Sequence, residues 1–165
     1  MKQIYTNAAN VVIWLGREAE DSDVAMSFVA NEGSAPLKPK GGAFRRIWTR
    51  EQGKALLSLC ERPYWRRIWI IQEIIHARQI IVLCGQKIFK WRSFENLYEK
   101  LKTIELRGWI AHHEFAARVL GSFASVMVWQ RAHWRHPETL APRLRTLLEV
   151  FQDWQCSDIR DKVFG

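Results

Sequence analysis

The sequence predicts an α/β fold with three layers, in which a mostly parallel sheet is flanked by helices. Two continuous apolar runs, Val11–Leu15 and Ile80–Cys84, are typical of strands covered on both faces, and each is closed by a glycine. Much of the sequence outside these two runs has the apolar spacing of helices, and we expect the C-terminal half to be rich in helix. Two clear strands are too few for a finished sheet, so we expect the sheet to be incomplete. A chain of 165 residues, 48% of them hydrophobic, is sized for one domain with a substantial core.

The first part of the chain alternates helix and strand. Residues 1–10 have the apolar spacing of the last turns of a helix, which leads into the strand at Val11–Leu15. Ser22 is a suitable N-cap for a second helix, whose apolar residues are Ala25, Met26, Phe28 and Val29. Residues 33–42 contain prolines and glycines, so we expect a surface loop there.

The middle of the chain predicts two further helices. Thr49 can cap a helix over Arg50–Cys60, and Pro63 ends it, because the residue before a proline is pushed out of the α region. A second helix is expected from about Tyr64 to Ala77. The strand that follows it ends in a tight turn at Gly85.

The remaining residues are predicted to be mainly helical. Residues 87–90 can pair back as a short strand, and Ser93 caps an amphipathic helix over 94–104. Residues 109–131 have the apolar register of one or two helices. After two prolines, residues 144–151 are helical again.

Glu73 is the most informative acid in the chain. The helix that carries it is apolar on nearly every side, so we expect that helix to be buried between layers. Glu73 lies almost opposite the isoleucine stripe, with Trp69 and His76 as helical neighbours. Buried acids are usually paired, so one interpretation is a structural pair with Arg66, Arg67 or a distant arginine. The other is a catalytic role, because active sites also hold acids in apolar surroundings.

Composition and charge disfavour several classes of protein. The net charge is +8, but the basic residues are spread among acids with no run of five or more, which indicates a solvated surface rather than a nucleic-acid site. No apolar stretch approaches the roughly 18 residues of a membrane span, and the N-terminus lacks the pattern of a signal peptide. Three cysteines without a CxxC pair favour a reducing, cytoplasmic setting over a zinc ribbon or a disulfide framework. His133 and His136 lack an ordered third ligand, so we expect neither a metal site nor a cofactor.

Three motifs occur in order along the chain. The first is I-Y-x-x-A-x-x-V-x-x-W-L-G at residues 4–16, and the second is R-x-W-x-x-Q-E-x-x-x-A at residues 67–77, followed by C-G at residues 84–85. The third is R-D-x-[VI]-[YF] at residues 160–164. Together they resemble the fungal heterokaryon incompatibility (HET) domain, a family that is remotely similar to the TIR fold and so to a flavodoxin-like sheet. The resemblance covers most of the chain and implies a single partial HET domain over residues 1–165.

The resemblance implies a function in fungal allorecognition, in which an intracellular effector triggers growth arrest or cell death when non-self is met. In catalytic TIR domains a glutamate that follows a W-C-x-x-E pattern acts on NAD, and W-I-I-Q-E at Trp69–Glu73 is similar. By that likeness Glu73 is the candidate catalytic residue of a hydrolase, with NAD as substrate. A carboxylate near the ribose can stabilise an oxocarbenium-like transition state. The alternatives are a non-catalytic module that signals through protein partners or self-association and, third, a nucleic-acid binder.

The motif residues divide into two groups. Those that the resemblance places around a pocket are Trp14, Gly16, Arg66, Trp69 and Gln72. Those expected to be structural are Cys84, Gly85, Arg160 and Asp161. Cys84 ends an apolar strand, which is typical of a small core residue, and Arg160 with Asp161 suits a cap or ion pair where Asp158 and Asp161 begin a further helix. For the tryptophans Trp14, Trp65, Trp69 and Trp91, a position in the core is the competing expectation.

The chain also departs from the family pattern at both ends. The family begins with A-L-S-Y-x-W-G and W-I-D-x-x-C-I-N-Q blocks, which are absent, and its last block continues with L-L-G where this chain stops at Gly165. We therefore expect Met1 to lie inside the domain and the chain to be a fragment or a shortened gene product. The missing blocks would remove at least one strand and about half of a pocket at the strand ends.

Overall fold

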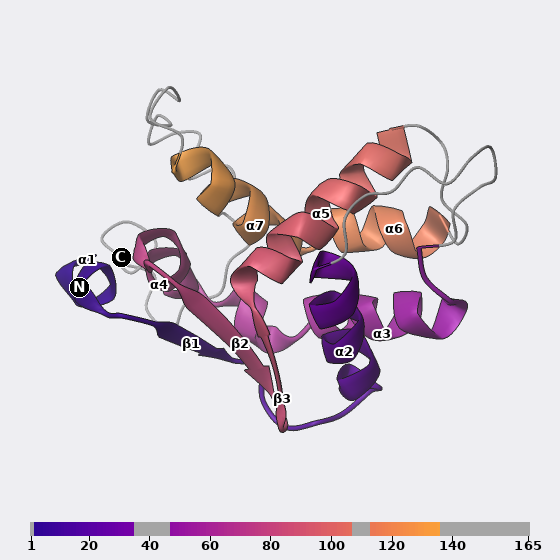
Figure 1. Cartoon of the computed structure of the whole chain (residues 1–165), viewed down its shortest axis with the longest axis horizontal. Coiled ribbons are helices and arrows are strands. Elements are labelled where there is room, and N and C mark those ends of the chain that lie inside the picture. Colours follow the sequence, from indigo (N-terminus) through magenta and orange to yellow (C-terminus); the bar gives the residue numbers. More distant parts are fainter. Residues whose placement is uncertain (1, 35–46, 107–112, 136–165) are drawn as a thin grey trace.

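The fold is built on a small sheet with helices packed against it, and its computed structural model describes residues 2–34, 47–106 and 113–135 (Figure 1). In chain order the elements are α1 (Lys2–Asn7), β1 (Val11–Trp14), α2 (Ser22–Ser34), α3 (Arg50–Cys60), the 3-10 helix η1 (Pro63–Arg66), α4 (Ile70–His76), β2 (Ile80–Cys84), β3 (Lys87–Lys90), α5 (Trp91–Leu106), α6 (His113–Leu120) and α7 (Phe123–Trp134). The helices predicted at 144–151 and at Asp158, together with Arg160, Asp161 and His136, lie outside the described residues. So does most of the loop predicted at 33–42, although its first two residues end α2.

The sheet has three strands in the order β1-β2-β3 and is mixed. β1 pairs in parallel with β2, whereas β2 and β3 form an antiparallel hairpin. The α/β class and the strand at 87–90 are confirmed, but the described sheet is not mostly parallel. The turn between β2 and β3 is only two residues long, and Gly85 has a φ of +54° there. A connection that short can join only antiparallel neighbours.

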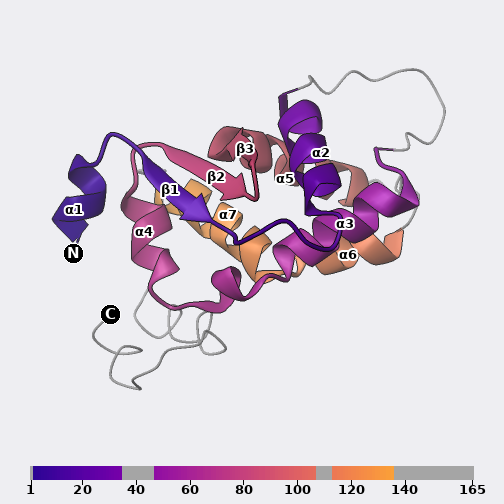
Figure 2. The ribbon, with the colours of Figure 1, turned by 90° about the horizontal axis from the view of Figure 1, so that it is seen from below.

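Helices cover one face of this sheet, while no helix of the described residues covers its other face, which we call the open face (Figure 2). On the covered face Ile13, Val82 and Phe89 form one row across the three strands, and none is more than 4% exposed. On the open face Trp14 and Ile88 are 60% and 62% exposed. Among the described residues there is therefore no second layer of helices, and the prediction of a core position is wrong for Trp14. The alternation of side chains along β1 turns Trp14 away from the buried Ile13.

The other tryptophans follow the prediction. Trp65 and Trp91 are at most 3% exposed, their rings lie 6.3 Å apart between centroids, and Trp69 packs against the same core. The Trp65 indole N–H donates to the Leu59 carbonyl over 2.9 Å, so its polar edge is satisfied inside the core.

Of the three predicted helix caps, the structure confirms the one at Thr49 and does not confirm those at Ser22 and Ser93. The cap at Thr49 is confirmed as a capping box: its hydroxyl accepts from the Gln52 N–H, and the Gln52 side chain accepts from the Thr49 N–H. Ser22 is instead the first residue of α2, and its hydroxyl accepts from the Ala19 N–H in the preceding turn. Ser93 does not cap α5, because that helix begins two residues earlier at Trp91.

The single helix expected from Tyr64 to Ala77 is wrong. The chain forms η1, becomes extended at Arg67 (φ −77°, ψ 129°) and only then enters α4. In a continuous helix Glu73, nine positions after Tyr64, would lie about 13 Å further along the helix axis. The break instead brings the Tyr64 hydroxyl to 2.9 Å from the Glu73 carboxylate. Between residues 109 and 131 the prediction of one or two helices is confirmed within the described part, as α6 and α7.

The C-terminal end of α2 is held by α5. The Asn96 amide donates to the Gly33 carbonyl over 2.9 Å, and the buried Lys100 ammonium donates to the Glu32 carbonyl. The carbonyls in the last turn of a helix have no N–H partner within that helix, so these two side chains supply the missing donors. The approach is so close that a Cβ at Gly33 would overlap the backbone of Ser93.

The C-terminal end of α4 is held in the same way by α7. Arg131, only 2% exposed, donates to the carbonyls of Ile74 and Ala77, the latter over 2.8 Å. Arg135 adds bonds to the Ala77 and Arg78 carbonyls over 2.7 and 3.0 Å. Burial, and then the neighbouring Arg135, lower the pKa of Arg131 to about 10, while Glu95 opposes this shift. A guanidinium presents several donors in a fixed fork, which suits a group of carbonyls at one helix end.

The substitution Gly33→Ala should destabilise the fold. Overpacking of a tight contact typically costs about 1–3 kcal/mol, and the opposing group here is backbone that cannot rotate away. Gly53→Ala on α3 is the matched control, because the atoms nearest to its Cβ belong to the Phe115 side chain, at 3.1 Å and beyond, and a side chain can shift more easily than backbone. Urea denaturation of both variants tests this, and an equal effect of the two substitutions would contradict the tight α2–α5 contact.

The substitution Arg131→Leu should lower the free energy of unfolding by more than about 2 kcal/mol, since it leaves carbonyls at the end of α4 without donors. Arg131→Lys should not restore stability, because one ammonium cannot reproduce the fork. Arg135→Leu, at an exposed position, should cost less. Chemical denaturation of the three variants measures the difference, and a full rescue by lysine would show that charge alone is needed.

Candidate functional site

The candidate site is centred on the carboxylate of Glu73, in the first turn of α4. Its Oε2 atom accepts a hydrogen bond of 2.9 Å from the Tyr64 hydroxyl of η1. Tyr5 of α1, which packs against α4, also lies close enough for its titration to respond to the charge of Glu73. Glu73 is half-buried, so its carboxylate faces two phenols from two other elements. We call Tyr5, Tyr64, Arg67 and Glu73 the Glu73 cluster.

Both phenols of the cluster remain protonated over the physiological range. Burial, followed by the charge of Glu73 and the hydrogen bond to it, raises the pKa of Tyr64 above its ordinary range, and Arg67 opposes the shift. The pKa of Tyr5 is raised by burial and then by Glu73, again against Arg67. A neutral phenol beside a carboxylate is a hydrogen-bond donor.

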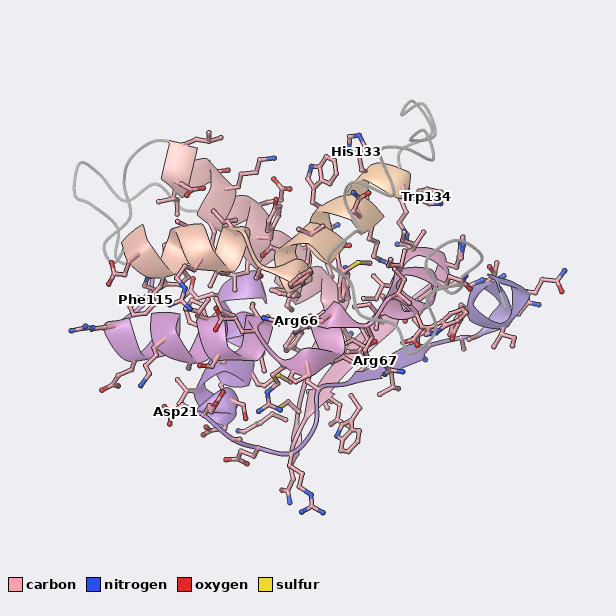
Figure 3. All side chains as sticks on the ribbon, turned by 180° about the vertical axis from the view of Figure 1, so that it is seen from behind. Asp21, Arg66, Arg67, Phe115, His133 and Trp134 are labelled. Carbon is pink, nitrogen blue, oxygen red and sulfur yellow. The ribbon has the colours of Figure 1, made fainter. Side chains whose placement is uncertain are left out.

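Of the two arginines expected to pair with Glu73, Arg66 is the last residue of η1 and Arg67 follows it (Figure 3). The Arg66 guanidinium lies over the Phe123 ring, 5.5 Å from its centroid, and the Arg67 guanidinium lies over Tyr64 at 5.8 Å. No ion pair within the described ranges includes Glu73. The hydrogen-bond partner of the acid is thus Tyr64, and the charge of Arg67 acts on the two tyrosines.

The remaining predicted pocket residues divide between two places. Trp69 and Gln72 are half-buried on the same turn as Glu73, and the Glu73 N–H donates to the Trp69 carbonyl over 3.4 Å. Trp14 and Gly16 lie instead at the C-terminal end of β1, whereas α1 and α4 lie near its beginning (Figure 2). The structure therefore brings Trp69 and Gln72 to Glu73 but does not bring Trp14 and Gly16 there.

A second cluster of motif residues forms where β1 and β2 end. The Gly85 N–H donates to the Gly16 carbonyl over 3.0 Å, and Gly16 has a φ of +99°, which favours glycine. Cys84 is a buried free thiol whose sulfur lies 3.8 Å from the Arg17 carbonyl. Arg62 closes the cluster with bonds to the carbonyls of Leu15, Arg17 and Ala19, at 2.7, 2.8 and 3.1 Å.

Sequence reasoning missed Tyr5, Tyr64 and Arg62 as parts of these two clusters. One signal was present for the tyrosines, because a phenol in an apolar segment usually finds a hydrogen-bond partner when it is buried. No local signal existed for Arg62, whose acceptors lie 43 to 47 positions earlier in the chain.

Two classes of feature are not seen in the described ranges. Within residues 2–34, 47–106 and 113–135, no three His, Cys, Asp or Glu side chains are grouped so that they could hold a metal ion. None of the helices in the same ranges has both the length and the apolar character needed to cross a membrane.

Comparison with known proteins gives two matches. The family model described as heterokaryon incompatibility protein (HET) matches residues 1–73, which end at Glu73. The chain is also 23% identical over 133 residues to heterokaryon incompatibility protein 6, OR allele, of Neurospora crassa, with 63% of this chain and 20% of that protein covered. The chain thus spans about a fifth of the length of this curated relative.

No solved structure matches the chain significantly, so the likeness to the TIR fold stays a prediction. The family resemblance itself is confirmed by two independent comparisons, one with a family model and one with a curated protein. Together with the motifs, these matches show that the chain is similar to the heterokaryon incompatibility (HET) family, with the family model matching residues 1–73.

Proposed function

We propose that the chain acts in fungal heterokaryon incompatibility, as a cytoplasmic effector whose output is growth arrest or cell death. The observation that carries this proposal is the extent of the family match, which includes all four residues of the Glu73 cluster and ends on its acid. The curated relative, itself named a heterokaryon incompatibility protein, supports the same function.

The chemistry available to the cluster favours a hydrolytic output in which NAD is cleaved. Oε2 of Glu73 accepts the Tyr64 hydroxyl, while within the described residues no donor bonds to Oε1. A carboxylate that is oriented through one oxygen and free at the other can stabilise the positive charge that develops on a ribose during glycosidic cleavage. Trp69, on the same helical turn, supplies an aromatic ring for stacking on a base.

A non-catalytic interaction module is the second candidate, and the open face of the sheet favours it. Val12, Trp14 and Ile88 on that face are 58%, 60% and 62% exposed. Large apolar side chains that gather on one exposed face are typical of a surface that contacts another protein or another copy. In this case Glu73 has a structural role, as the acceptor that fixes η1 against α4.

The substitution Glu73→Gln separates these two candidates. If Glu73 is catalytic, inducible expression of the variant in a fungal host should no longer arrest growth, and intracellular NAD should fall about 100-fold more slowly than with the unchanged chain. Glu114→Gln, an exposed acid in the first turn of α6, is the control and should behave as the unchanged chain.

Other outcomes of this experiment are equally informative. Continued growth arrest by a folded Glu73→Gln variant would rule out the catalytic role. Loss of arrest without any effect on NAD would favour the interaction module. If the unchanged chain does not arrest growth, the effector proposal itself is wrong.

The substitution Tyr64→Phe measures how much the hydrogen bond between Tyr64 and Glu73 contributes to stability. Loss of a hydrogen bond to a charged group should lower the free energy of unfolding by about 1.5–3 kcal/mol at pH 7. Tyr98→Phe is the control, because the Tyr98 hydroxyl has no hydrogen bond within the described residues.

The pH dependence of stability provides a second readout of the same substitution. The folded-state pKa of Tyr64 is raised above its ordinary value of 10.0, so its contribution is complete below pH 10 and is lost as the pH rises further. The unchanged chain should therefore lose stability above pH 10 more steeply than Tyr64→Phe. Urea denaturation at pH 7 and in the alkaline range tests this, and parallel curves would show that Tyr64 and Glu73 are not coupled.

A further inference from the structure

A groove on the other side of α7 takes no part in the Glu73 cluster. It has a volume of about 440 Å³ and lies between α5, the end of α6 and α7. The residues that line it are Tyr98, Lys102, Leu120, Ser125, Val126, Trp129 and Gln130. This volume falls within the range of about 300–1,000 Å³ that is usual for small-molecule sites.

Gln130 is the residue that points to a ligand. It is only 6% exposed and lines the groove, yet its side-chain amide has no hydrogen-bond partner within the described residues. Among the described residues, the side-chain polar atoms that are sealed from solvent without a partner are Trp91 Nε1 and Arg131 Nε, so the Gln130 amide still opens into the groove and can pair with a molecule there. The amide offers a donor and an acceptor side by side.

The aromatic wall of the groove is formed by Trp129. Its indole is 39% exposed, and it stacks on the His133 imidazole with 4.7 Å between ring centroids and 21° between planes (Figure 3 shows His133 near the end of α7). This stacking holds the indole in position. Leu120 and Val126 complete an apolar surface that suits a flat ring.

Lys102 supplies the positive charge of the groove. Among the described lining residues it is the one charged side chain, and it forms no ion pair with a described residue. Burial, and then the charges of Glu99 and Glu105 on the same helix, raise the pKa of Tyr98. The Tyr98 hydroxyl therefore stays a neutral donor beside the ammonium group.

We propose that this groove binds a planar heteroaromatic ring that carries an anionic group, the chemical class to which adenine nucleotides belong. The edge of the ring pairs with the Gln130 amide, as glutamine pairs in two hydrogen bonds with adenine. The face of the ring stacks on Trp129, and the anion meets Lys102. None of these contacts involves the Glu73 cluster, so the site is independent of the proposed function.

Calorimetric titration of the purified chain with AMP tests this site. AMP should bind at least tenfold more tightly than adenosine, which lacks the anion, and than ribose 5-phosphate, which lacks the ring. Inorganic phosphate alone should bind still more weakly.

Three substitutions in the groove should each weaken AMP binding about tenfold or more, because each removes one of the three contacts: Gln130→Leu, Lys102→Gln and Trp129→Leu. Two controls should leave binding unchanged: Trp134→Leu, an exposed tryptophan on α7 outside the lining, and Lys54→Gln on the surface of α3. Thermal unfolding establishes that each variant is folded. Because Lys102 and Trp129 are partly exposed, their substitutions still test the site if the substitution of the buried Gln130 disturbs the packing of α7.

Several outcomes would overturn the proposal. The proposal is wrong if AMP does not bind at millimolar concentration, or if ribose 5-phosphate binds as tightly as AMP. It is also wrong if the groove variants and the control variants lose the same amount of AMP affinity. Because binding is measured directly on the purified chain, its result does not depend on whether expression of the chain arrests growth.

Discussion

The structure depends on how backbone carbonyls at the ends of short elements are satisfied. β1 has four residues and α4 has seven, so much of each element is an end with unpaired polar groups. Arg62 donates to three carbonyls beyond β1, and Arg131 donates to the carbonyls that close α4. Both sets of bonds join segments that are far apart in the chain: Arg62 ties the start of η1 to the residues after β1, and Arg131 ties the end of α4 to α7. The lowered pKa of Arg131 reflects the burial that this arrangement requires.

The position of α4 in turn decides the geometry of the Glu73 cluster. Because the chain is extended at Arg67 between η1 and α4, Tyr64 turns back and donates to Glu73. A single straight helix would have separated the two groups. α7 links this cluster to the groove, since two neighbouring residues on it point in different directions: Arg131 bonds to the carbonyl that ends α4, and Gln130 lines the groove. One helix therefore supports both the proposed catalytic acid and the proposed ligand site.

Much of the fold could be predicted from local patterns. The two apolar strands, the β2–β3 hairpin and the capping box at Thr49 follow from interactions within a few residues, and all are present. The errors arose where distant contacts override local preference. The apolar sequence from Tyr64 to Ala77 favours one helix, but burial of Trp65 beside Trp91 and the bond from Tyr64 to Glu73 stabilise a break. The exposure of Trp14 could not be read from its continuous apolar run, because such a run is typical of a strand covered on both faces, whereas the described helices cover only one.

The sequence by itself determined the α/β class, the main strands, the family motifs and Glu73 as the candidate acid, because these depend on spacing and residue type along the chain. Only the tertiary structure decided that Tyr64 is the hydrogen-bond partner of Glu73, that Trp14 and Gly16 lie apart from it, and that Gln130 faces a groove. The reason is that these features depend on residues that are far apart in the chain. Only the packing of the helices on the sheet brings such residues close enough for hydrogen bonds between side chains, or from an arginine to a distant carbonyl. Periodicity shows which face of a helix is buried, but it does not show which polar group that face meets.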